Sequence, residues 1–79
     1  MSDAIHPAPA EFSPEALAAD PILRYFHCQH LPPQLQAASK PFCDLARMIV
    51  GTLPRNAERS VALRKLLEAK DAAVRANVS

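Results

Sequence analysis

The feature that most constrains this chain is a run of apolar residues with helical spacing in its middle third. These side chains recur every three or four residues, which places them on one face of an α-helix. They are Leu35, Ala38, Phe42, Leu45, Ile49 and either Thr52 or Leu53. Pro41 lies inside the run, where a proline removes one backbone hydrogen bond and crowds the carbonyl of Ala37. We therefore predict a long helix that kinks or breaks near residues 37–39 and ends at Gly51, shortly before Pro54.

A second amphipathic helix is predicted after Asn56, whose side chain suits the N-cap position. Its apolar face consists of Ala62, Leu63, Leu66, Leu67, Ala69, Ala73 and Val74. Two helices of similar length joined by a few residues pack antiparallel. We therefore predict an all-α fold, a helical hairpin of two longer antiparallel helices preceded by a short N-terminal helix.

Self-association is expected because the apolar face of the second helix is wider than one partner helix can cover. The 79 residues form one domain at most, and a domain of this size is marginally stable as a monomer. We therefore expect the hairpin to assemble as an oligomer.

The N-terminal part contains two helix-start signals, because Ser13 and Asp20 each precede a proline. They predict two short helical turns, of which the second carries an apolar and aromatic cluster with no partner of its own, which must therefore dock on another surface. This cluster is Ile22, Leu23, Tyr25 and Phe26. We divide the chain into a flexible tail over residues 1–19, which includes a short helix, and a hairpin domain over residues 20–79.

Charge and composition restrict the environment and the partners. Nine Lys and Arg residues against eight Asp and Glu residues give a formal net charge of +1, which argues against a protein that coats polymeric nucleic acid. From Lys40 onward basic residues predominate. The sequence shows neither a signal peptide nor an apolar run of roughly 18 residues. We expect a soluble cytosolic protein without a membrane partner.

The residues with catalytic or metal-binding chemistry do not form a recognised pattern. His27, Cys28, His30 and Cys43 could bind zinc, but three donors within four residues depart from the usual ligand spacing. A nucleophilic cysteine would need a base and an orienting group, which the sequence does not indicate. We predict a protein that is not an enzyme, with no catalytic residues, no metal and no cofactor.

Two clusters of polar residues are candidates for binding an anion. Ser39 and Lys40 precede Pro41, where a broken helix would expose backbone N–H groups; alternatively, Ser39 is a helix cap and Lys40 is solvated. Arg59, Ser60, Arg64 and Lys65 open the second helix, and a guanidinium binds phosphate in a bidentate way. A solvated charged face is the alternative for this cluster.

The aromatic residues Tyr25 and Phe26 could stack on a nucleobase, although packing in the core is the commoner role of such residues. Together with the hydroxyl and basic residues, they would suit a small phosphorylated nucleotide.

The chain resembles a known family over about Tyr25 to Ala76. The resemblance rests on an ordered pattern of short segments. They are Phe26-His27-Cys28-Gln29-His30-Leu31-Pro32, Leu35-Gln36, Ser39-Lys40-Pro41-Phe42, Leu45-Ala46, Leu53-Pro54, Glu58-Arg59 and Ala62 to Ala73. These segments are similar to a small protein of tailed phages and to the hairpin domain shared by the phage anti-CBASS and Thoeris anti-defence sponges.

The resemblance implies a homohexamer in the host cytoplasm that sequesters cyclic di- and trinucleotide messengers and performs no chemistry on them. It implies pockets between protomers, in which an aromatic residue stacks on a base and basic or hydroxyl residues hold phosphates. The positions that correspond are the aromatic residue before the His-Leu-Pro turn (Tyr25 or Phe26), the Ser39-Lys40 pair and Arg59. Together with His30, Ser60 and Arg64 they are the predicted ligand-binding residues. Cys28 departs from the pattern, since the family commonly has Tyr there.

Two other functions remain open. An oligomeric adaptor would use the apolar face of the hairpin to bind a protein partner and would have no nucleotide ligand. Weak binding of nucleic acid through basic residues of the second helix would depend steeply on salt, but the near-neutral total charge disfavours it.

Overall fold

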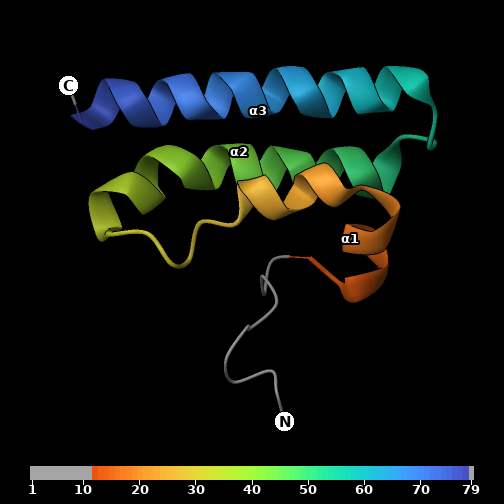
Figure 1. Ribbon diagram of the computed structural model, residues 1–79, viewed down its shortest axis with the longest axis horizontal. Coiled ribbons are helices and arrows are strands. Elements are labelled where there is room, and N and C mark those ends of the chain that lie inside the picture. The colour runs from red at the N-terminus through yellow and green to blue at the C-terminus, as the bar shows by residue number, and fades with distance from the viewer. Residues whose placement is uncertain (1–11, 79) are drawn as a thin grey trace, which may run out of the picture.

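The computed structural model describes residues 12–78 and contains helices and loops but no strand in that range (Figure 1). In chain order the elements are the α-helix α1 (Pro14–Ala19), the 3₁₀ helix η2 (Pro21–Phe26) and the α-helices α2 (Pro33–Thr52) and α3 (Ala57–Val78). The predicted all-α fold is confirmed. The first eleven residues of the predicted flexible tail lie outside the described residues.

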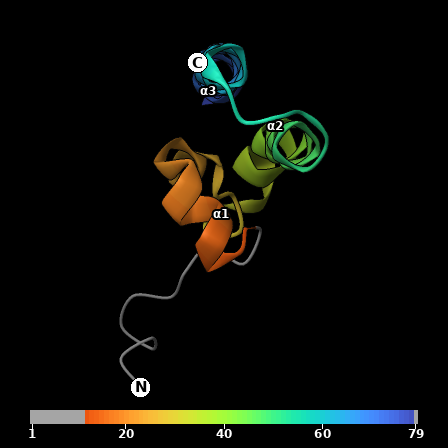
Figure 2. The same cartoon turned by 90° about the vertical axis from the view of Figure 1, so that its right-hand side faces the viewer.

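The two long helices lie side by side and run in opposite directions (Figures 1 and 2). At one end of the pair, the Arg59 guanidinium donates a hydrogen bond to the Leu53 carbonyl over 3.1 Å. At the other end, the Asn77 amide donates to the Gln34 carbonyl over 2.8 Å. The backbone N–H of Arg59 donates to Oδ1 of Asn56 over 2.9 Å, which confirms Asn56 as the cap of α3.

The 3₁₀ helix η2 contacts both helices of the hairpin, so that the three elements enclose the core (Figure 2). A 3₁₀ helix has three residues per turn, which aligns Leu23 with Phe26, and both side chains are fully buried. The hairpin is therefore the surface on which the apolar cluster of η2 docks, although Tyr25 of this cluster stays 58% exposed.

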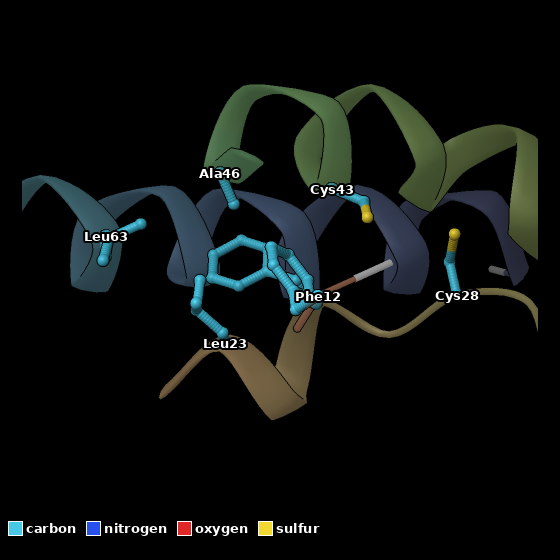
Figure 3. Packing of buried hydrophobic residues seen from close by; sticks show 7 residues of the cluster. Phe12, Leu23, Cys28, Cys43, Ala46 and Leu63 are labelled. Carbon is cyan, nitrogen blue, oxygen red and sulfur yellow. The ribbon is translucent and has the colours of Figure 1, made fainter. Parts of the chain in front are cut away.

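Small residues of α2 make room for these bulky side chains. Ser39, Cys43 and Ala46 recur at helical spacing and are all buried, and Figure 3 shows Cys43 and Ala46 on the side of α2 that faces Leu23. The predicted stripe of α2 is therefore only partly right. Phe42 and Ile49 pack against the core, whereas Leu45 is 44% exposed.

Of the kink or break predicted near residues 37–39, the break is wrong, because α2 continues through Pro41 to Thr52. The kink stays a prediction. A proline removes only one hydrogen bond of the helix. The buried residues Ser39 and Cys43 lie on either side of Pro41 in the sequence, so packing holds both parts of the helix against the core.

The segment before η2 is more ordered than predicted. The Ser13 hydroxyl accepts a hydrogen bond from the N–H of Ala16 over 3.1 Å, which confirms the N-cap of α1. Phe12 is buried in the core, so the tail assigned to residues 1–19 extends too far along the chain. Asp20 makes no side-chain cap to η2, contrary to the prediction, because its carboxylate pairs with Arg59.

Candidate functional site

A groove follows the line where η2 lies against α3, and two adjoining hollows make it up. One hollow, of about 330 Å³, lies beside the second half of α3, between Lys70 and Arg75. The other, of about 370 Å³, reaches Arg64. Arg24 and Tyr25 line both hollows. We call the two hollows together the seam groove.

The order of the residues along the groove shows that η2 and α3 run in the same direction. Near its start, Pro21 and Ile22 share a hollow with Arg64, whereas His27 and His30, which follow η2, share one with Lys70 and later residues of α3. A smaller hollow of about 220 Å³ continues the seam past Arg64 to Ser60. Residues from the two halves of the chain therefore meet along one line.

Positive charge gathers along the seam groove. Arg24, Arg64, Lys70 and Arg75 line it, and Asp71 is the acidic residue that lines it. The Lys70 ammonium lies 3.1 Å from the Asp71 carboxylate. Within residues 12–78, no acidic side chain pairs with Arg24 or Arg64. The groove is thus basic although the whole chain carries a formal net charge of only +1.

Tyr25 gives the groove an accessible aromatic surface, because its side chain is 58% exposed. Phe26 is 0% exposed, so its predicted role in base stacking is wrong in this structure and only its packing role remains. Adjacent residues of a 3₁₀ helix point about 120° apart, which explains why one aromatic ring faces the groove and the next one fills the core.

His27 and His30 form a stacked pair, with ring centroids 4.5 Å apart and an interplanar angle of 20°. Both imidazoles line the same hollow as Lys70 and Arg75. Imidazole nitrogens donate or accept hydrogen bonds according to their protonation. The pair therefore adds polar groups to the more basic hollow of the groove.

The structure brings together three of the residues predicted to bind a ligand, since Tyr25, His30 and Arg64 line the seam groove. Ser60 is exposed and lines the smaller hollow next to Arg64. The predicted site is therefore preserved in part, but its other members lie elsewhere.

Arg59 is buried, in contrast to the exposed phosphate ligand that the sequence predicted. Its side chain is 8% exposed and pairs with the equally buried Asp20 carboxylate. The same guanidinium donates hydrogen bonds to the carbonyls of Val50 and Leu53 over 3.4 and 3.1 Å. These contacts join the start of η2 to the corner between α2 and α3, so Arg59 has a structural role.

Ser39 and Lys40 do not form the predicted anion site at a broken helix. Ser39 lies inside α2, is 0% exposed, and its hydroxyl has no hydrogen-bond partner among the described residues. Because α2 is continuous, its backbone N–H groups are not freed at this point, and Ser39 is not the cap of a new segment either.

Lys40 is solvated and lines neither hollow of the groove. Its ammonium donates a hydrogen bond to Asp44 over 3.0 Å. This hydrogen bond, together with the attraction of the same carboxylate, raises the pKa of Lys40 above its ordinary value of 10.5. Lys40 therefore forms a surface ion pair on α2.

Three basic residues of the groove were missed by the sequence analysis as ligand-binding residues, namely Arg24, Lys70 and Arg75. A signal existed on α3, where Arg64, Asp71 and Arg75 are spaced by seven and four residues and so share a face. The sequence did not show that η2 would lie along this face and bring Arg24 beside it.

The described residues contain no group of three or more His, Cys, Asp or Glu side chains that could hold a metal ion. Cys28 and Cys43 are buried in the core, where Figure 3 shows them on the loop before α2 and on α2 itself. Among residues 12–78, no helix combines the length and the apolar character needed to cross a membrane.

The fold and the groove together define a small all-α protein with a basic, partly aromatic groove between a 3₁₀ helix and the last α-helix. Comparisons with models of protein families, with curated proteins and with solved structures find no match for this chain.

Proposed function

We propose that this protein binds a small phosphorylated nucleotide in the seam groove and acts as a sponge for cyclic di- and trinucleotide messengers of host anti-phage defence. The observation that carries the proposal is that an exposed tyrosine, Tyr25, lines one groove with Arg24 and Arg64. No acidic side chain of residues 12–78 pairs with either guanidinium group. The resemblance to the anti-defence sponges supplies the class of ligand.

The chemistry of the groove suits both parts of a nucleotide. Guanidinium groups bind phosphate through paired, charge-assisted hydrogen bonds. A base that stacks on an aromatic side chain gains about 1–3 kcal/mol. Ile22 and Leu67 add apolar surface beside Tyr25, which would cover the second face or the edge of a base.

Sequestration requires binding and no reaction, so the proposal assigns no catalytic role to any residue. The proposal places the protein in the host cytoplasm, where such messengers act.

The proposal also includes self-association, up to the homohexamer that the resemblance implies. Large exposed apolar side chains support this part, and they are Leu45 and Met48 on α2, Leu53 in the turn and Val61 on α3.

Calorimetry with cyclic dinucleotides and trinucleotides tests the proposal directly, and thermal unfolding provides a second readout. A ligand present at about 100 times Kd stabilises the folded state by about 2.7 kcal/mol. We expect Arg64→Ala to weaken binding about tenfold or more, because it removes a guanidinium that lines the groove beside Tyr25 and can stack on a base.

Arg47→Ala is the matched control, because Arg47 is an exposed arginine of α2 that does not line the groove. It should bind like the unsubstituted protein. Flat titrations and unchanged melting curves with all the cyclic ligands would refute the proposed function.

A protein-binding adaptor is the second candidate, and the exposed side chains of Leu45 and Met48 favour it. An adaptor would lose its partner on Leu45→Glu and would be indifferent to Arg64→Ala. A nucleotide sponge would show the opposite sensitivity in ligand binding, so the same two variants separate the two functions.

A further inference from the structure

We propose that the seam groove has a phosphate subsite and a base subsite, separated by Arg24 and Tyr25, so that a bound nucleotide lies along α3 in one direction. The phosphate would point toward the C-terminal end of α3 and the base toward Arg64. This inference rests on the proposed function and specifies how the same groove recognises its ligand.

The phosphate subsite is the hollow lined by His27, His30, Lys70 and Arg75. Two cationic side chains of α3 and two imidazoles converge there, and Arg24 reaches it from η2. Asp71 offsets part of this charge through its contact with Lys70. The Lys70 side chain is only 13% exposed, which restricts its motion and so lowers the entropy lost on binding an anion.

The base subsite is the neighbouring hollow, which has fewer polar side chains. Both hollows have apolar lining, since Leu31 and Val74 also line the phosphate subsite. Pro21, Ile22 and Leu67 line the base subsite with apolar atoms, and Arg64 is the cationic residue that only this hollow of the groove contains. A flat, weakly polar base fits such a surface, because a guanidinium can stack on a π system while apolar side chains exclude water.

Arg24 and Tyr25 line both hollows, so they stand where the sugar of a nucleotide would join the two subsites. From this position Tyr25 can stack on the base and Arg24 can contact the phosphate. Since η2 and α3 run in the same direction, the two ends of the groove differ. A ligand bound in reverse would place its phosphate beside Arg24 and Arg64, away from the two imidazoles, Lys70 and Arg75 of the other hollow.

The test uses the full chain and three small probes: AMP, which contains both parts, adenosine, and ribose 5-phosphate. We expect AMP to bind more tightly than either fragment in calorimetric or NMR titrations. Arg75→Gln should weaken ribose 5-phosphate and AMP about tenfold, make AMP binding less sensitive to salt, and leave adenosine unaffected. Tyr25→Ala should weaken adenosine and AMP and leave ribose 5-phosphate unaffected.

Lys65→Gln is the control, because Lys65 is an exposed α3 cation that pairs with Glu68 and does not line the groove. It should change none of the three affinities. If Arg64→Gln weakens ribose 5-phosphate while Arg75→Gln does not, the assigned direction is wrong although the proposed function stands. Failure of AMP to bind to a protein that binds a cyclic dinucleotide would also overturn the two-subsite arrangement. Failure of every nucleotide would instead remove the proposed function.

Discussion

At the scale of single residues, the ion pair between Asp20 and Arg59 is the contact that changes the interpretation of the sequence most. The two residues are 39 positions apart and both are buried. Each looked like a surface residue in the sequence, Asp20 as a cap and Arg59 as a phosphate ligand. Local sequence patterns indicate helix caps and amphipathic helix faces. They do not indicate which charged residues, far apart in the sequence, will be buried together.

Replacing Arg59 should therefore destabilise the fold. Arg59→Ala leaves the Asp20 carboxylate buried without its cation, and removing one partner of such a pair costs about 3–5 kcal/mol. Urea denaturation followed by circular dichroism measures this loss in the free energy of unfolding. Arg55→Ala is the control, because Arg55 is exposed and donates only to the Ala19 carbonyl over 3.0 Å. Equal free energies of unfolding for the two variants would show that the buried ion pair does not stabilise the fold.

At the scale of elements, the sequence predicted the existence, order and termini of the helices well. Periodicity, the caps at Ser13 and Asn56 and the stop at Pro54 are local, so they could be predicted without the fold. Gly51 is not the predicted left-handed C-cap, because it lies inside α2 and α2 ends at Thr52. The buried face of α2 was less well predicted, because it depends on what packs against it. The face of α2 that is buried against η2 carries the small residues Ser39, Cys43 and Ala46, because they leave room for the large side chains of Leu23 and Phe26.

The continuous helix through Pro41 leads to a prediction at this scale. A proline in a helix interior costs about 3 kcal/mol relative to alanine, although it also restricts the unfolded chain, which returns about 1 kcal/mol. Pro41→Ala should therefore raise the free energy of unfolding by about 2 kcal/mol. Pro33→Ala is the matched control, because Pro33 is the first residue of α2, where proline is favourable. Urea denaturation measures both variants. A rise in the midpoint of the unfolding transition for Pro33→Ala but not for Pro41→Ala would contradict this account of α2.

At the scale of the whole molecule, η2 changes which surfaces remain apolar. From the sequence, part of the apolar face of α3 had no partner. In the structure η2 covers this part, so that Leu63, Leu66 and Leu67 are buried or partly buried. Among residues 12–78, the large apolar side chains that stay exposed on the hairpin are instead Leu45 and Met48 on α2, Leu53 in the turn, Val61 near the start of α3 and Val78 at its end. The candidate site was likewise only partly predictable, because the line of contact between η2 and α3 brings Arg24 to Lys70 and Arg75.

The position of this exposed surface separates assembly from binding. We expect Met48→Glu to lower the mass measured by light scattering toward that of a single chain, because a charge at an apolar contact is costly to bury. We expect the same variant to keep its affinity for AMP, because no residue of α2 lines the seam groove. Gln34→Glu, a substitution at the other end of α2, should change neither the measured mass nor the affinity for AMP.

If Met48→Glu lowers both the measured mass and the affinity for AMP, the ligand is held between copies of the chain, as the resemblance implies. The groove of a single chain would then be insufficient for binding. If the mass of the unsubstituted protein is already that of one chain, the exposed residues of α2 must serve another partner, which is the condition that the adaptor function requires.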